Sequence, residues 1–486
     1  MREEGLSRPP WAILALLVSA KIAIAMAVAD HYGWHRDEFY YLASSKHLAL
    51  GYVDYPPLTP LLAAVDQLIF PRSLPGLRLL AVLASAAIIV IAALIARELD
   101  GNRTAQALAA GAVLISPEFI GTNFLFQTVA FDEVMWALAC WVFVRLLMGA
   151  NPREWLLLGL IFGIGVETKY TIIGLGVAML IGLLATPQRR LLASRWPYLG
   201  LGLAALLLVP NLTWQVSHHW DSVAYTLTHR GATDGPILYW VEQVLLVGPP
   251  LIPMVVGGVL LLWRHERLRA AAVTVIAVEL FFFLVGGKAY YPAPIYPLAY
   301  AAGAIWLLAS VKRASHLRRS VAIALAITLV LLPLGLPVLP TRIMVKSGIW
   351  QARKDFADMI GWPELTKQVT DVYQQIPVSE RQSVMILASN YGEAGALQYY
   401  GQGLPTVVCA HLTYYYWAPA QMHPSIIIVI GYPRDYLVSL FGDVQQAATI
   451  SNSFGIHNEE FGQAIWIVRN PRHTLSQVFP QLKALD

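Results

Sequence analysis

The sequence has few charged residues and almost no cysteine. Only 13% of its 486 residues are charged, whereas 57% are hydrophobic. Ordinary soluble domains carry about 25% charged and about 45–50% apolar residues, so the composition excludes a simple soluble domain and indicates a polytopic membrane protein. Of the two cysteines, Cys140 lies within an apolar stretch and Cys409 near the C-terminus, so a structural disulfide is not expected.

The sequence also lacks the motifs of several enzyme classes. It contains no Walker loop and no Gly-x-Gly-x-x-Gly fingerprint, which excludes the nucleotide sites that these motifs build. It contains no Gly-x-Ser-x-Gly turn, which excludes the hydrolases that hold their nucleophile on this turn. His31 and His35 are four residues apart, but the stretch reads as a loop, so neither a divalent metal nor another cofactor is expected.

Apolar segments of membrane length are abundant in the first 340 residues. A membrane-spanning helix needs about 20 mainly apolar residues, and on this criterion we predict about eleven spans. The predicted spans are 11–29, 77–97, 105–117, 130–147, 155–166, 171–185, 198–214, 237–263, 270–285, 292–309 and 321–339. After residue 340 the composition becomes that of a soluble domain, so we predict a transmembrane domain over 1–340 and a soluble domain over 341–486.

Lys and Arg are unevenly distributed between the loops. With the N-terminus inside, alternate loops are basic, as at Arg189-Arg190 and Lys312-Arg313, and the opposite loops are poorer in these residues. Positive charge resists translocation, so this pattern predicts a multi-pass membrane protein with an odd number of spans and with Asp37 and the C-terminal domain on the outer, extracytoplasmic side. The net charge of +4 then reflects the inner loops and gives no reason to invoke nucleic acid. Ala27-Val28-Ala29 is similar to a signal cleavage site, but we expect the first span to be retained.

An acidic pair, Asp37-Glu38, follows the first predicted span. Ionised carboxylates beside hydrocarbon are costly, so such a pair is a candidate functional site, although any outer loop must carry some charge. Helical spacing over 39–50 and 61–70 predicts two short helices lying flat on the outer membrane surface. These juxtamembrane helices would hold Asp37 at the interface, within reach of a lipid head group and of an acceptor from outside.

Other polar side chains fall on the same predicted side of the membrane. They are Asp132 and Glu133 at the start of a span, Lys169 in a tight turn, His229 and Arg230 in a long loop, and Lys288 before a proline-rich helix. Each alone is usually an interfacial anchor. Together they favour transfer from a phosphate-linked donor, because a carboxylate can take a proton from a hydroxyl and cations can stabilise a departing phosphate.

Four short motifs carry a resemblance to a known family. They are Asp37-Glu38 with Tyr40-Tyr41 and Asp54-Tyr55-Pro56-Pro57, then Phe131-Asp132-Glu133, then Glu167-Thr168-Lys169-Tyr170, and last Gly287-Lys288 with Tyr291, Pro294 and Pro297. In this order they resemble the GT-C glycosyltransferases that use polyprenyl-phosphate sugars. The likeness is to the bacterial protein O-mannosyltransferase-like family (glycosyltransferase family 39), which is related to lipid A aminoarabinose transferase. It covers about the first 340 residues.

The resemblance implies an inverting transfer of a sugar from a polyprenyl-monophosphate donor to an acceptor hydroxyl of a lipid, glycan or protein on the outer face. It implies that Asp37 is the general base, with Glu38 and Asp132 in supporting catalytic roles. The residues that it implies for the donor phosphate are Lys288, Tyr291, Lys169, Arg230 and His229. Asp54-Tyr55-Pro56 stands where the aminoarabinose transferase has Glu-Lys-Pro, so one phosphate-binding lysine is absent and the donor is expected to be held differently.

The C-terminal part reads as a small α/β domain. Strand patterns at 383–388, 406–410, 425–431 and 464–468 alternate with helical patterns at 391–400 and 436–441, which predicts a doubly wound sheet. Tyr391 and the aromatic run Thr413-Tyr414-Tyr415-Tyr416-Trp417 could stack on sugars or pack against the membrane part, and both interpretations remain open. The candidates for binding the acceptor or sugar are Glu133, Tyr40, Tyr55, Tyr391 and Glu393.

Two other functions remain open from the sequence alone. A multi-span transporter or a flippase of a lipid-linked substrate would also have many spans, but its charges would lie near the middle of the membrane. In this chain the candidates at that depth are Lys21 and Glu279, and most of the charge lies at the outer rim. A non-catalytic scaffold for polysaccharide assembly would not need Asp37 and Lys288 together.

Overall fold

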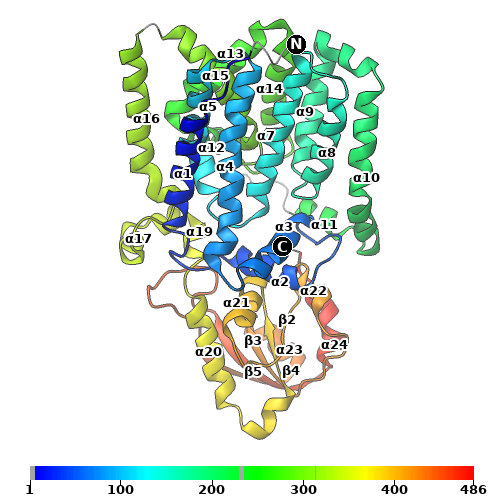
Figure 1. The fold of residues 1–486 in the computed structure, drawn as a ribbon. Coiled ribbons are helices and arrows are strands. Elements are labelled where there is room, and N and C mark those ends of the chain that lie inside the picture. Colours follow the sequence, from blue (N-terminus) through cyan, green and yellow to red (C-terminus); the bar gives the residue numbers. More distant parts are fainter. Residues whose placement is uncertain (1–5, 229–234, 312, 486) are drawn as a thin grey trace.

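The computed structural model describes residues 6–228, 235–311 and 313–485, which form a helical bundle with a small sheet beyond one end (Figure 1). The bundle contains α1 (Trp11–Met26), α4 (Leu74–Glu98), α5 (Arg103–Ile115), α6 (Pro117–Gly121), α7 (Thr128–Leu147), α8 (Glu154–Val166), α9 (Ile172–Leu184), α10 (Trp196–Ser217), α12 (Pro236–Val247), α13 (Ile252–Arg264), α14 (Arg269–Leu284), α15 (Tyr296–Ser310) and α16 (Ala314–Gly335). Helix α1 starts at the end of the bundle that is remote from the sheet, and α16 runs down to the end of the bundle that is nearer the sheet (Figure 1).

Each predicted span corresponds to a helix of the bundle, except that one predicted span is divided into two helices. Residues 237–263 form α12 and α13, which are bent by 81° at their junction. The junction is Gly248-Pro249-Pro250, where Gly248 has a φ of +87° and the two prolines lack the N–H that a continuous helix needs. By length and composition, four of the described helices could each cross a membrane, or up to six if each bent pair counts as one span. The exact number of spans therefore stays a prediction.

Glycines let neighbouring helices of the bundle approach closely. A Cβ atom at Gly159 of α8 would lie 2.1 Å from the carbonyl oxygen of Gly200 in α10. One at Gly258 of α13 would lie 2.2 Å from the carbonyl oxygen of Ala299 in α15. Small residues of this kind stabilise helix pairs in membranes, where the hydrophobic effect does not drive helices together.

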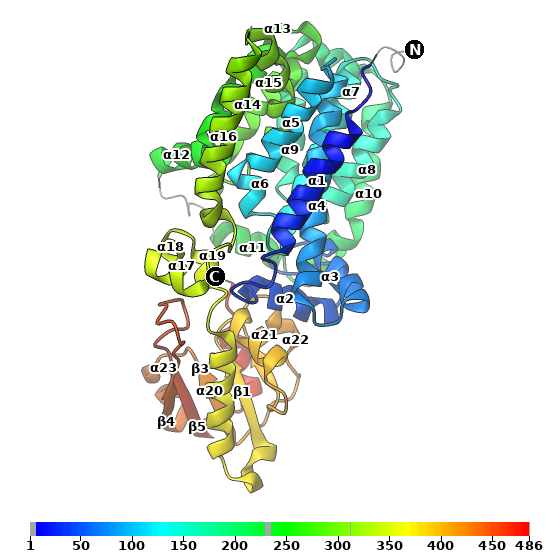
Figure 2. The same ribbon diagram turned by 60° about the vertical axis from the view of Figure 1, so that its left-hand side comes forward.

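Short helices lie between the bundle and the sheet (Figure 2). They include α2 (Arg36–Lys46), α3 (Leu58–Ile69) and α11 (Asp221–Thr228). On α3, Leu61, Val65 and Leu68 are 47%, 47% and 85% exposed, and this apolar stripe suits a helix at a membrane surface. The predicted short helices at 39–50 and 61–70 coincide with α2 and α3, but most of α2 is covered by other parts of the chain.

The C-terminal sheet has the strand order β2-β1-β3-β5-β4. Its strands are β1 (Val384–Ala388), β2 (Val407–Cys409), β3 (Ile426–Ile430), β4 (Phe441–Thr449) and β5 (Ala464–Pro471). The helices of this part of the chain are α17 (Thr341–Ser347), α18 (Ile349–Ala352), α19 (Lys354–Ala357), α20 (Trp362–Gln375), α21 (Tyr391–Tyr400), α22 (Tyr414–Trp417), α23 (Arg434–Leu440) and α24 (Leu475–Val478). Strands β2, β1 and β3 are parallel, whereas β5 runs antiparallel to β3 and β4. The sheet is therefore mixed, and β4 was missed because its sequence, Phe-Gly-Asp-Val-Gln-Gln-Ala-Ala-Thr, has no apolar run.

Helices cover both faces of this sheet. On one face Ile426, Ile428 and Ile430 of β3 belong to a buried cluster that also contains side chains of α20 and α21. On the other face Ile427 and Val429 pack in a cluster with side chains of α23 and α24. The first cluster continues into α2 and α4 of the membrane part, so the two parts of the chain share a core.

Candidate active site

Asp37 occupies the first turn of α2. The residue before the helix, His35, caps it. Nδ1 of His35 accepts a hydrogen bond from the backbone N–H of Asp37 at 3.2 Å, and the backbone N–H of His35 donates one to Oε2 of Glu38 at 2.9 Å. This reciprocal arrangement is a capping box, which fixes where the helix begins. The free N–H groups and the dipole at this end of the helix favour a negative side chain at Asp37.

The Asp37 carboxylate is held by side chains from two distant parts of the chain. Its Oδ1 accepts a hydrogen bond from the hydroxyl of Tyr391 at 2.7 Å, and its Oδ2 accepts one from Nε2 of Gln127 at 2.9 Å. Gln127 precedes α7 and Tyr391 starts α21. The Asp37 side chain nevertheless remains 30% exposed, so its carboxylate is still accessible.

Glu38, the other half of the acidic pair, is completely buried and paired. Nε and Nη2 of Arg78 donate to its two carboxylate oxygens, each at 2.8 Å, and both side chains are 0% exposed. Arg78 also donates to the carbonyl oxygens of Ala29 and Gly33, at 2.7 and 2.9 Å. Glu38 therefore ties α2 to α4 and to the end of the first span, and no substrate can reach it in this structure.

His35 faces a second acidic group. Its Nε2 is buried, makes no hydrogen bond to the described residues and lies 4.0 Å from carboxylate oxygens of both Asp355 and Asp358. Burial raises the pKa of Asp358 above its usual range, and the nearby His35 opposes this rise. Within the described ranges, no group of three or more His, Cys, Asp or Glu side chains is arranged to hold a metal ion.

The predicted cations gather near two tyrosines that follow α14. Nζ of Lys169 lies 4.7 Å from the ring centre of Tyr290 and 4.8 Å from that of Tyr291, which is cation–π geometry. Lys288 is exposed and close enough to Asp37 and Asp355 to be attracted by both carboxylates. Partial desolvation and the neighbouring Lys169 lower the pKa of Lys288 below its usual value. His229 and Arg230, the other predicted phosphate ligands, lie outside the described residues.

The second acidic motif lies in the first turns of α7. Oδ2 of Asp132 accepts a hydrogen bond from the hydroxyl of Thr171 at 2.6 Å, while Lys169 provides a favourable charge nearby. Glu133 accepts hydrogen bonds from Thr122 and Asn123, at 3.0 and 2.5 Å. Both carboxylates are buried, so neither lies on an open surface.

The predicted sugar ligands on α2 and in its following loop lie within the protein core. Tyr40 is 1% exposed and donates a hydrogen bond to Asp54 at 3.0 Å, and Tyr55 is 3% exposed and bonded to the hydroxyl of Ser44 at 2.6 Å. Burial raises the pKa of Asp54 to about 7. Glu393 is also buried: it accepts hydrogen bonds from the N–H and hydroxyl of Ser389, and burial raises its pKa to about 7.

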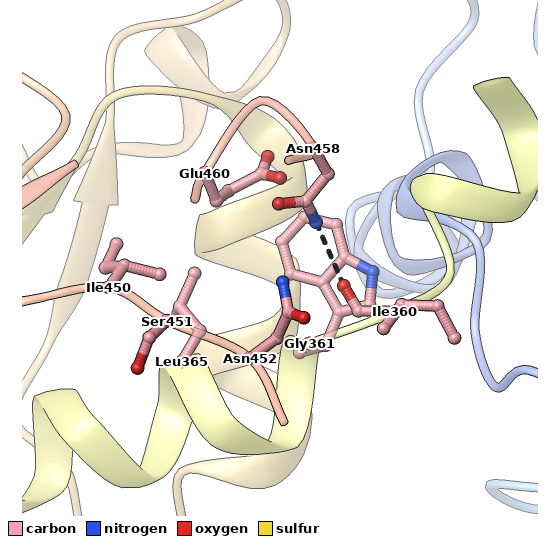
Figure 3. Close-up of a pocket in the computed structure, with 9 residues that line it drawn as sticks. Ile360, Gly361, Leu365, Ile450, Ser451, Asn452, Asn458 and Glu460 are labelled. Carbon is pink, nitrogen blue, oxygen red and sulfur yellow. Dashed lines mark hydrogen bonds between the residues drawn. The ribbon is translucent and has the colours of Figure 1, made fainter. Parts of the chain in front are cut away.

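Two cavities lie near this cluster. A mainly apolar cavity of about 230 Å³ lies between α6, the α12–α13 bend and α16, and its charged lining residue is Arg353. A much smaller one, about 10 Å³, lies between α20 and the loop after β4 (Figure 3). This is roughly the space of one water molecule. Glu460 lines the small cavity with both carboxylate oxygens unbonded to the described residues, and burial raises its pKa to about 8.

Several residues of this cluster were not among the sequence predictions. Arg78 carried a usable signal, because it is a charged residue at the start of an otherwise apolar span. Gln127 and Arg353 carried none, because a single amide or arginine in a loop is common, and His35 was a candidate only as a metal ligand. Their places depend on contacts between segments far apart in the sequence.

The sequence and the fold of this chain are similar to those of known proteins. Residues 54–214 match the Dolichyl-phosphate-mannose-protein mannosyltransferase family. The crystal structure of ArnT from Cupriavidus metallidurans in the apo state superimposes with a TM-score of 0.61 and 14% identity, over 93% of this chain and 97% of that one. The chain has the fold of the GT-C glycosyltransferases. As in that fold, it is a multi-pass membrane protein with a C-terminal α/β part.

Other known proteins are similar to this chain in sequence or in fold. Undecaprenyl phosphate-alpha-4-amino-4-deoxy-L-arabinose arabinosyl transferase 1 of Pseudomonas fluorescens is 24% identical over 327 residues, or 60% of this chain. The match spans 59% of that curated relative's length. The arabinofuranosyltransferase AftD from Mycobacteria superimposes with a TM-score of 0.55 and 14% identity, over 97% of this chain and 40% of that chain. A further ArnT structure from Cupriavidus metallidurans, with the same TM-score of 0.61, is bound to undecaprenyl phosphate.

Proposed function

We propose that the chain is a membrane glycosyltransferase that moves a sugar from a polyprenyl-monophosphate donor to an acceptor hydroxyl. The observation that carries this proposal is the state of the Asp37 carboxylate. It is held by two hydrogen bonds yet 30% exposed, and it lies close enough to Lys288 for mutual attraction. A proton acceptor and a cation for a leaving phosphate therefore occupy the same end of the bundle.

The chemistry follows from these two groups. Asp37 takes the proton of the acceptor hydroxyl as the oxygen attacks the anomeric carbon, from the side opposite to the phosphate. The new carbon–oxygen bond forms as the bond between the anomeric carbon and the phosphate oxygen breaks, and the configuration inverts. The electron pair of the broken bond stays on the phosphate, where Lys288 stabilises the added charge and Lys169 supports it. Tyr291 holds Lys169 in place through its ring.

The apolar cavity supplies a place for the lipid carrier. Its walls are side chains of α12 and α16, and α16 has few buried residues and therefore faces outward along much of its length. Arg353 at the cavity forms a 2.8 Å ion pair with Asp355, which in turn faces His35 and attracts Lys288. A polyprenyl chain in this cavity would bring its phosphate towards these cations. The ArnT relative that binds undecaprenyl phosphate supports a carrier of this kind.

We place the site on the periplasmic side of a bacterial inner membrane. The support is the distribution of Lys and Arg, which favours a cytoplasmic N-terminus, and the position of α2 and the sheet at the opposite end from the start of α1 (Figure 1). Residues 341–486 would then form the extracytoplasmic domain. A donor from the outer leaflet could reach the site without crossing the membrane.

Three other predicted residues, Glu38, Asp132 and Glu133, are buried, so we assign them supporting roles. Glu38 holds α2 in place through Arg78, and it is not given a chemical step. Asp132 and Glu133 are buried, and the carboxyl group of Asp132 interacts electrostatically with Lys169. The acceptor hydroxyl belongs to a lipid, a glycan or a protein.

The test is reconstitution of the purified protein in vesicles with undecaprenyl phosphate that carries a radiolabelled sugar. The proposal expects label to move from the carrier to an acceptor added outside, from a panel of lipid, glycan and peptide hydroxyls. Label that crosses the vesicle membrane while still attached to its carrier would contradict the proposal and favour a flippase. Both functions would be contradicted if the label stays on its carrier, and the carrier stays on its starting face of the membrane, for every carrier and acceptor tested.

A further inference from the structure

The C-terminal domain reaches the proposed base through α21, which packs against α2 (Figure 2). The two helices are in close contact: a Cβ atom at Gly395 of α21 would lie 2.5 Å from Cβ of Phe39, and one at Gly392 would lie 3.1 Å from Cβ of Arg36. Arg36 also forms an ion pair with Glu459 in the loop between β4 and β5. The position of α21 on α2 is therefore fixed by backbone approach as well as by charge.

Tyr391, the first residue of α21, uses this contact to hold Asp37. Its ring stacks on Tyr40 with centres 4.7 Å apart and on His411 at 5.3 Å, and the guanidinium of Arg36 lies 5.0 Å from it. The ring is thus clamped on several sides, and its hydroxyl donates to Oδ1 of Asp37 at 2.7 Å. Burial raises the pKa of Tyr391 well above its usual range, so the hydroxyl keeps its proton and acts as a donor.

We propose that Tyr391 is a positioning residue that holds the Asp37 carboxylate in one orientation, and that the C-terminal domain is thereby part of the catalytic unit. This rests on the proposed role of Asp37 as base. A hydrogen bond to a carboxylate favours the charged form. Tyr391 holds one carboxylate oxygen and Gln127 holds the other, so the carboxylate has one orientation.

The structure offers a matched control in the same helix. Tyr399 of α21 also crosses to the membrane part, but its hydroxyl donates to the carbonyl oxygen of Arg72, at 2.9 Å, instead of to Asp37. Tyr391→Phe and Tyr399→Phe each remove one hydroxyl and one contact between the two parts of the chain. Both keep the aromatic ring, so both variants should fold, and equal thermal unfolding midpoints would verify this.

The first measurement is the pH dependence of sugar transfer. Removal of one donor to a carboxylate should raise the acid-side midpoint by about one pH unit in Tyr391→Phe. It should lower kcat about tenfold with little change in KM for the donor, and Tyr399→Phe should match the wild type. Equal losses in both variants, with no pH shift in either, would show that the hydroxyl only helps the two parts to dock and would overturn the proposal.

The second measurement does not depend on transfer. A water-soluble carbodiimide reacts with protonated carboxyl groups, and mass spectrometry can follow labelling of Asp37 in the full chain as the pH changes. The labelling midpoint should rise by about one pH unit in Tyr391→Phe and stay unchanged in Tyr399→Phe. No rise in Tyr391→Phe would overturn this proposal even if transfer is observed. A rise in a chain that transfers no sugar would instead overturn the proposed function.

Discussion

Replacement of Arg78 by Met should destabilise the protein strongly, because Arg78 is the buried counter-ion of Glu38. Arg78 and Glu38 are both 0% exposed and share two hydrogen bonds of 2.8 Å. Without Arg78, Glu38 keeps the backbone N–H groups of His35 and Phe126, while the carbonyl oxygens of Ala29 and Gly33 lose a donor. Breaking a buried pair by removing one partner costs about 3–5 kcal/mol, or roughly two to three and a half powers of ten in the unfolding equilibrium.

The assay is thermal or denaturant unfolding in detergent, with a double-mutant cycle. Arg78→Lys keeps the charge but loses the planar fork, so its loss of stability should be intermediate. Arg78→Met combined with Glu38→Gln removes the unpaired charge and should recover part of the loss. A loss below about 1 kcal/mol in Arg78→Met, or no recovery in the double variant, would refute the view that this pair anchors α2.

Three further changes test other parts of the site. Lys288→Met should lower kcat/KM for the donor about a hundredfold by loss of phosphate stabilisation, measured by initial rates; a value within about threefold of wild type would count against Lys288. Leu331→Trp should fill the apolar cavity and raise KM for a long-chain donor more than for a short-chain one, and equal effects on both would argue against carrier binding there. Burial raises the pKa of Glu460 to about 8, so its neutral form contributes stability that is lost as the pH rises through 8. Glu460→Gln should therefore raise the unfolding midpoint at about pH 9 but not at about pH 5, and a gain at the lower pH alone would contradict this.

The sequence was sufficient to predict the bundle, the acidic pair and the alternation in the C-terminal part. Those predictions depend on local signals: apolar length for spans, scarcity of charge for Asp37-Glu38, and β-branched runs such as 426–430 for strands. The sequence could not predict that the two members of the acidic pair have different surroundings. Its two members are neighbours in sequence, but successive helical side chains point in different directions, so Glu38 faces Arg78 while Asp37 remains exposed.

The side chains that hold Asp37 could not be predicted for a different reason. Tyr391 is 354 residues away in the sequence, and nothing local to either residue encodes their contact. The bend between α12 and α13 was missed although Gly248-Pro249-Pro250 is a strong break signal, because the apolar length of 237–263 outweighed it. That bend forms part of the wall of the apolar cavity.

The most direct test of the whole account is sugar transfer by Asp37→Asn, compared with Asp30→Asn. Asp30 is an exposed acid just after α1 and has no role in the site, so it controls for loss of charge at this end of the bundle. The amide introduced by Asp37→Asn still has an oxygen that can accept a hydrogen bond, which favours normal folding, but it cannot take a proton. The account expects Asp37→Asn to bind the donor normally and to lose roughly a thousandfold or more in transfer rate, while Asp30→Asn keeps wild-type activity. Transfer by folded Asp37→Asn at a rate close to wild type would contradict it.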